Sequence, residues 1–75
     1  MARANLDESF ASQLRTYRLA RGLTQEDLAE QVGVTRQTII AIEKSKFVPS
    51  VKLAMQLAAC LRIPVDQLFW ISRPG

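Results

Sequence analysis

The stretch TQEDLAEQVGVTRQTIIAIEK, residues 24–44, decides the fold of this chain. Its apolar residues recur at helical spacing on both sides of Gly33, which predicts two short amphipathic helices joined at that glycine. Helices that cross steeply a few residues apart nearly touch, so the first helix needs a small side chain at the crossing and the hinge must accept positive φ. Ala29 and Gly33 meet these requirements.

The second predicted helix has two different faces. Ile39 and Ile42 lie three residues apart, and we expect them to pack beneath the first helix with Leu28, Val32 and Val34. The opposite face is left free, and five residues share it: Arg36, Gln37, Ile40, Ala41 and Lys44.

The residue types on this free face are those that read duplex DNA. Arginine pairs bidentately with guanine, glutamine pairs with adenine, and small apolar side chains rest on thymine methyls. We therefore expect base contacts from Arg36, Gln37, Ile40 and Ala41. As the N-cap, Thr35 would turn the positive end of the helix toward a phosphate. The alternative is an ordinary helical corner with a solvated face, which would leave the apolar side chain of Ile40 exposed to water.

With these stretches in view, the chain resembles the Cro and phage-repressor-like helix-turn-helix regulators, the XRE family, over residues 10–69. The resemblance is carried by RGLTQEDLA (21–29), VGVTRQTIIAIEKSKFVPS (32–50) and IPVDQLF (63–69). It implies an all-α fold, a compact five-helix bundle of the lambda-repressor type, in which helix three enters the major groove. It also implies phosphate contacts by Gln25, Lys44 and Lys46, and a partly buried ion pair between Arg18 and Glu43.

Length and charge agree with this interpretation. We expect residues 1–75 to form a single helix-turn-helix DNA-binding domain, with 1–6 as a loose arm and 70–75 as a C-terminal tail. The net charge of +3 is mild, but the segment around the second motif helix is locally basic.

Several functional classes are excluded by composition. The chain has no histidine and one cysteine, so neither a transition-metal site nor histidine-based catalysis can be built. No phosphate-binding glycine loop is present, and we expect no enzyme activity, no metal and no cofactor. Cys60 is interpreted as a small core or boundary residue. No long apolar run or secretory signal occurs, which favours a bacterial-type cytoplasm, association with the nucleoid and no membrane contact.

The remainder of the chain is predicted to be helical scaffold. We expect a first helix over 7–20, with Asn5 and Glu8 as a capping box, an inward stripe and a stop at Gly22; the stripe is Phe10, Leu14 and Tyr17. A fourth helix should begin after Ser50 and run to 61, burying Leu53, Leu57, Ala58 and Leu61. A short fifth helix over 65–69, after Pro64, should direct Val65 and Leu68 into the core.

Two positions depart from the family pattern. Ser45 and Arg62 stand where relatives commonly have glycine after a helix. If the left-handed cap is kept, each residue bears roughly 1 kcal/mol of strain.

Together these features predict a sequence-specific transcriptional regulator, a repressor that binds a pseudo-palindromic operator as a homodimer. The dimer is expected to form through four residues of the C-terminal segment: Leu68, Phe69, Trp70 and Ile71. Alternatively, Trp70 folds back as a lid on its own core. Three other functions stay open: an antitoxin paired with a toxin, a restriction-modification controller, or a protein-interaction adaptor that uses the aromatic C-terminus.

Overall fold

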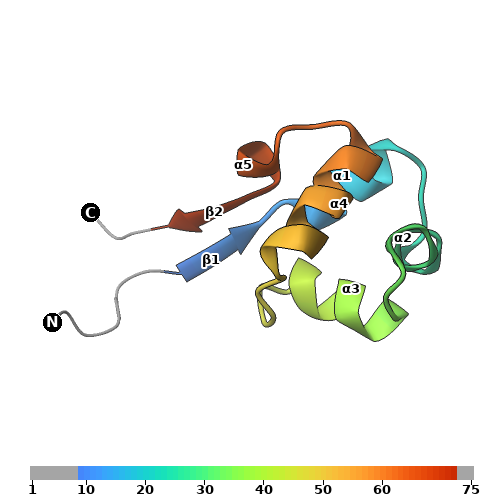
Figure 1. The fold of residues 1–75 in the computed structure, drawn as a ribbon, viewed down its shortest axis with the longest axis horizontal. Helices are drawn as coiled ribbons and strands as arrows, with labels where there is room; N and C mark the ends of the chain where they lie inside the picture. Colours follow the sequence, from blue (N-terminus) through green and yellow to red (C-terminus); the bar gives the residue numbers. More distant parts are fainter. Residues whose placement is uncertain (1–8, 73–75) are drawn as a thin grey trace, which may run out of the picture.

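The computed structural model describes residues 9–72, and within this range the chain forms five helices and two strands (Figure 1). In chain order they are β1 (Ser9–Ser12), α1 (Leu14–Ala20), α2 (Gln25–Val32), α3 (Arg36–Glu43), α4 (Val51–Leu61), α5 (Val65–Leu68) and β2 (Phe69–Ser72). The molecule is elongated, 41 × 21 × 19 Å, with the two strands at one end and α2 at the other (Figure 1).

Local caps bound the two motif helices, and those at Gly33 and Thr35 are as predicted. The side chain of Thr24 accepts a hydrogen bond from the backbone N–H of Asp27, whose carboxylate accepts one from the N–H of Thr24, and this capping box starts α2. Gly33 ends α2 in the left-handed conformation at φ 75°. Thr35 then caps α3 through the N–H of Thr38, at 3.3 Å.

The helices enclose one apolar core. Its fully buried members come from α1 to α5, namely Leu14, Leu28, Ile39, Ile42, Leu57, Leu61 and Leu68. Ala29 is buried, at 3% exposure, and α2 packs on α3 and on α4. The prediction for α4 is confirmed, because Ser50 caps it and all four expected residues are buried.

The prediction that residues 7–20 form one helix is wrong in its first half. Residues 9–12 form β1, which pairs antiparallel with β2, so that Phe10 lies opposite Ile71 and Ser12 opposite Phe69. The rings of Phe10 and Phe69 stack with centroids 5.4 Å apart. This pairing with a segment about sixty residues away overrides the local helical pattern. The fold is therefore five helices with a two-stranded sheet and not all-α.

The C-terminal segment also differs from expectation. Helix α5 ends at Leu68, and residues 69–72 continue as a strand and not as an irregular tail. Leu68 is buried as predicted, but Val65 is 39% exposed, so its expected place in the core is wrong. Leu68 enters the core, whereas Val65 lines an apolar groove at the surface together with Phe69. The expected arm 1–6, the Asn5–Glu8 capping box and residues 73–75 of the tail lie outside the described residues.

Both positions that depart from the glycine pattern have positive φ. Ser45 and Arg62 each have φ 59°, and Arg62 caps α4 in the left-handed conformation. Within residues 9–72, no helix is both long and apolar enough to cross a membrane.

Candidate nucleic-acid interface

The outer face of α3 gathers the residues that the helical spacing places together. Ile39 and Ile42 are fully buried, which fixes the rotation of α3 on the core. The side turned away from them is solvent-accessible: Arg36, Gln37 and Lys44 are exposed, and Ile40 and Ala41 are half-buried. Lys46 is exposed in the turn that follows α3.

The N-terminus of α3 is organised by two threonines. The hydroxyl of Thr35 accepts from the N–H of Thr38 and lies 3.2 Å from the Thr38 hydroxyl. The Thr35 hydroxyl is thus engaged in the cap. A phosphate at this end of α3 would meet the first free backbone N–H groups together with the positive end of the helix dipole.

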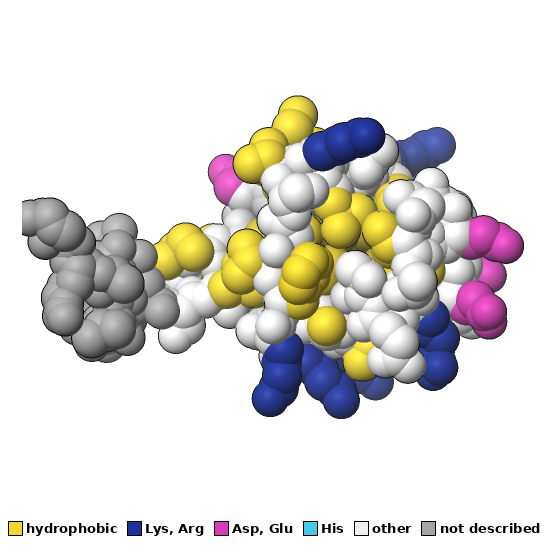
Figure 2. Space-filling model, turned by 60° about the horizontal axis from the view of Figure 1, so that its bottom comes forward, with side chains coloured by type: hydrophobic (Ala, Val, Ile, Leu, Met, Phe, Trp, Pro, Cys, Tyr) yellow, Lys and Arg dark blue, Asp and Glu magenta, His cyan; other side chains and the backbone are white. Residues whose placement is uncertain are grey.

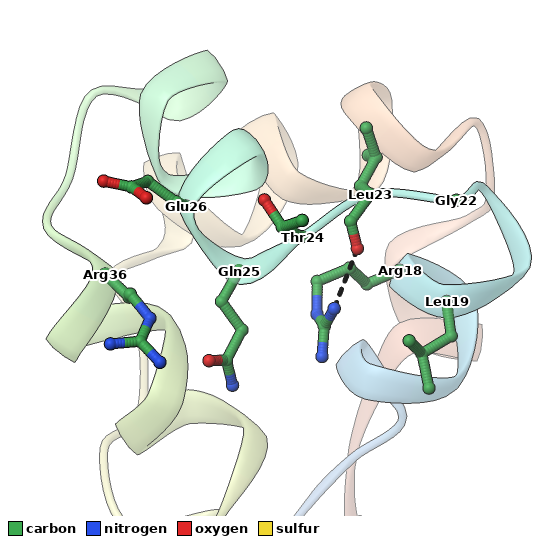
Figure 3. A pocket seen from close by; sticks show the side chains of 8 residues that line it. All are labelled: Arg18, Leu19, Gly22, Leu23, Thr24, Gln25, Glu26 and Arg36. Carbon is green, nitrogen blue, oxygen red and sulfur yellow. Dashed lines mark hydrogen bonds between the residues drawn. The ribbon is translucent and has the colours of Figure 1, made fainter.

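An open depression of about 610 Å³ lies where α1, the start of α2 and the start of α3 meet (Figure 3). Its walls include Gln25 and Arg36, whose side chains point to the same side of the molecule (Figure 3). The remaining lining residues are Arg18, Leu19, Gly22, Leu23, Thr24 and Glu26. Arg36 belongs both to this depression and to the outer face of α3.

Beneath this surface, Arg18 and Glu43 form the ion pair that the resemblance implies. Nε of Arg18 lies 2.6 Å from Oε2 of Glu43, and the two side chains are only 7% and 4% exposed. Nη1 of Arg18 also donates to the carbonyl of Leu23 at 2.8 Å. The pair is hydrogen-bonded on both sides, which compensates the loss of water around two buried charges.

Gln25 joins this network, a contact that the sequence did not reveal. Its Nε2 donates to Oε1 of Glu43 at 3.1 Å, so the amide is directed at α3. Any phosphate contact by Gln25 therefore has to use the second amide hydrogen or the backbone N–H. Eighteen residues separate Gln25 from Glu43, and no local periodicity relates them. These hydrogen bonds link α1, α2 and α3, and so fix the position of the outer face of α3 relative to the other two helices.

Charge is distributed unevenly around the interface. In Figure 2, several Lys and Arg side chains line the lower edge and others lie at the top, while most of the visible acidic side chains lie at the right end. The acids of α2 are Glu26, Asp27 and Glu30, all exposed. Hydrogen bonds from the backbone N–H and the side chain of Thr24 lower the pKa of Asp27. Glu26 and Asp27 lie in the first turn of α2, where the positive end of the helix dipole favours negative charge.

The four residues expected at a dimer interface differ in exposure. Leu68 is fully buried and Phe69 is 9% exposed, so both side chains pack mainly within their own chain. Trp70 and Ile71 remain 41% and 54% exposed on β2. With that exposure, Trp70 does not act as a lid over its own core. Cys60 lies at the boundary of the core, where its Sγ donates to Oε1 of Gln31 at 2.7 Å.

Comparison with known proteins places this architecture in a family. The helix-turn-helix family HTH_3 matches residues 14–68. An HTH-type transcriptional regulator of Methanocaldococcus jannaschii is 50% identical over 58 residues, which are 77% of this chain and 88% of the relative. The cryptic phage CTXphi transcriptional repressor RstR of Vibrio cholerae is 34% identical over 59 residues, 79% of this chain and 53% of the repressor.

A solved structure agrees. The restriction-modification controller protein C.AhdI of Aeromonas hydrophila superposes with a TM-score of 0.67 at 33% identity, covering 72% of this chain and 78% of the controller. The relatives come from archaea and bacteria. The matched region spans α1 to α5, including the capped motif helices and the outer face of α3. The chain therefore belongs to the XRE-type helix-turn-helix family of DNA-binding transcriptional regulators.

Proposed function

We propose that the chain represses transcription by binding a pseudo-palindromic operator as a homodimer, with α3 of each copy in the major groove. One observation carries the proposal: α3 is held by Ile39 and Ile42 so that a face bearing Arg36 and Gln37 is turned to solvent. A regulator of this kind would occupy polymerase sites on DNA and act at the nucleoid in the cytoplasm.

Within this proposal, the outer face divides into base and phosphate contacts. Arg36 and Gln37 are the hydrogen-bonding readers, and Ile40 and Ala41 offer apolar surface to thymine methyls. Ala41 is too short to reach a base edge with a hydrogen bond, so specificity depends mainly on the first two residues and on DNA shape. The phosphate contacts are assigned to Gln25, Thr35, Lys44 and Lys46.

A restriction-modification controller is the favoured second candidate, because 72% of this chain superposes on the controller C.AhdI at 33% identity. A controller would use the same DNA-binding surface and differ in the gene that it regulates. An antitoxin would share the surface as well and add a toxin as its protein partner. The adaptor alternative loses part of its support because Phe69 is buried.

The test is selection of bound fragments from random duplex DNA, followed by binding of variants to the selected site and to random DNA. Arg36→Ala and Gln37→Ala should each weaken specific binding by about 1–3 kcal/mol and leave non-specific binding nearly unchanged. Gln67→Ala, an exposed glutamine on α5, is the matched control and should change neither. Failure to select any common sequence, or equal losses on both DNAs for Arg36→Ala, would contradict the proposal.

A further inference from the structure

An apolar groove lies between the start of α4 and the two-stranded ribbon. Its volume is about 350 Å³, and its walls are Phe10, Val48, Pro49, Val51, Ala54, Met55, Val65 and Phe69. None of these side chains is charged. Val51 is 76% exposed and Met55 is 60% exposed, although nothing in the helix-turn-helix motif requires them at the surface. Soluble monomers seldom leave a contiguous apolar surface of this kind uncovered, so we expect other protein surface to cover the groove.

The segments of the chain that flank the described residues are poorly suited to fill the groove. Residues 1–8 read MARANLDE, with charges at Arg3, Asp7 and Glu8, and residues 73–75 read RPG. Inserting either segment would bring charged side chains to an uncharged apolar lining, which is costly unless they are paired. These two segments are therefore not favoured as occupants of the groove.

A fitting apolar projection lies beside the groove, on the chain itself. Ile71 is 54% exposed on β2, and the strand register places it opposite Phe10, on the ribbon face that bears Phe10 and Phe69. The groove and Ile71 thus adjoin each other on one face. A surface that carries both a hollow and a projection of the same chemistry can complement a second copy of itself about a two-fold axis.

The ribbon itself also indicates a missing neighbour. Within residues 9–72, β1 and β2 pair only with each other, and each keeps one free edge. A two-stranded ribbon is marginal in water unless other strands or helices cover it.

We propose that the apolar groove is the seat of Ile71 from a second copy of this chain, and that two copies exchange this contact about a two-fold axis. The inference rests on the proposed function, since it names the surface through which the two DNA-binding copies pair. It leaves Leu68 out of the interface, retains Phe69 as a wall of the groove, and adds the other groove residues to Ile71.

The dimensions of the molecule agree with this contact. Two recognition helices on successive turns of one face of DNA are about 34–36 Å apart, so each lies about 17 Å from the two-fold axis. The molecule is 41 Å long, the ribbon occupies one end, and α3 lies between the ribbon and α2 (Figure 1). An axis near the ribbon end thus leaves the outer faces of both α3 helices free for DNA.

The experiment uses two substitutions that should each break both copies of the contact. Met55→Lys places a charge in the groove, and Ile71→Glu places the opposite charge on the projection. Both residues are exposed, so folding of the chain should be preserved, as circular dichroism will verify, with Val51→Lys replacing Met55→Lys if needed. Gln56→Lys adds the same charge to an exposed α4 position that does not line the groove, and is the matched control.

Sedimentation at micromolar concentration should show a dimer for the wild type and for Gln56→Lys, and a monomer for Met55→Lys and for Ile71→Glu. An equimolar mixture of the two monomeric variants should again form a dimer, because the mixed dimer contains one native contact and one contact in which the two introduced charges are opposite in sign. On DNA, Met55→Lys should keep its affinity for a single half-site and lose about 100-fold or more on the full operator.

Three results would overturn the inference. A Met55→Lys protein that stays dimeric would show that the interface lies elsewhere. A mixture of Met55→Lys and Ile71→Glu that stays monomeric would show that Ile71 does not bind in the groove. A monomeric wild type would remove the second copy as the occupant, and a melting temperature that falls with Met55→Lys would then assign the groove to a segment of its own chain. Each result is distinguishable from failure of the proposed function, which would appear as equal binding of the wild type to selected and random half-sites.

Discussion

At the scale of single residues, the buried ion pair is the most consequential polar feature of the chain. Arg18 is 6% exposed and makes its hydrogen bonds to Glu43 and to the carbonyl of Leu23. The pair stands below the candidate interface and joins α1 to α3, so its loss affects both stability and the presentation of α3.

Glu43→Ala should therefore lower the free energy of unfolding by about 3–5 kcal/mol, because it leaves the buried guanidinium of Arg18 without its carboxylate. Urea denaturation of the variant measures the loss. Glu30→Ala, which removes an exposed acid from α2, is the control and should change stability little. A Glu43→Ala protein as stable as the wild type would show that the pair contributes nothing.

Two residues with positive φ, Gly33 and Arg62, give predictions of opposite sign for the stability of the protein. Gly33 has φ 75°, and a Cβ built there meets nothing within 4 Å, so Gly33→Ala should cost about 1–2 kcal/mol through backbone conformation alone. Arg62 has φ 59° in the same kind of helix cap, and Arg62→Gly should stabilise by up to about 1 kcal/mol. Thermal melts of both variants check the signs; stabilisation by Gly33→Ala would contradict the conformational argument.

At the scale of elements, the start of α2 depends on a reciprocal cap. Thr24 and Asp27 each satisfy a backbone N–H of the other, at 2.9 and 3.0 Å. Thr24→Ala should destabilise the protein by about 1 kcal/mol, because the N–H of Asp27 loses its acceptor. Chemical denaturation at neutral pH measures this, with Thr16→Ala on α1 as an exposed threonine for comparison.

The same cap predicts a pH dependence. Hydrogen bonds from Thr24 lower the pKa of Asp27, so the folded state favours the carboxylate. The stabilisation is present above the pKa of aspartate in the unfolded chain, about 4, and is lost as the pH falls through the lower folded value. The difference in unfolding free energy between wild type and Asp27→Ala should accordingly shrink on going from pH 7 to pH 3. A difference that is independent of pH would rule out the carboxylate as the stabilising species.

At the scale of the whole molecule, the lysines at the outer face of α3 should determine how strongly DNA binding depends on the salt concentration. Lys44 and Lys46 are exposed beside the outer face of α3. Lys44→Ala should weaken binding to all sequences and reduce the slope of log K against log salt by roughly one unit, since one fewer phosphate is neutralised. Arg36→Ala should leave the slope closer to that of the wild type, and an unchanged slope in Lys44→Ala would remove that residue from the phosphate contacts.

The sequence by itself determined the motif and most of the helical core. Thr24, Gly33, Thr35 and Ser50 act on their own backbone neighbourhood, and Ile39 and Ile42 follow a helical period, so both signals are local. The outer face of α3 follows from the same period. Its expected contacts with bases and phosphates remain predictions.

Only the tertiary structure decided the ribbon, the exposure of Val65, the burial of Phe69, and the link from Gln25 to Glu43. The local pattern of residues 9–12 predicts a helix, but their backbone pairs with residues 69–72, and no local pattern indicates this pairing. Phe69 is buried because Phe10 stacks on it from the other end of the chain. Contacts between residues that are distant in sequence produce no periodic pattern in that sequence. These contacts decided which apolar side chains of the C-terminal segment entered the core and which stayed exposed.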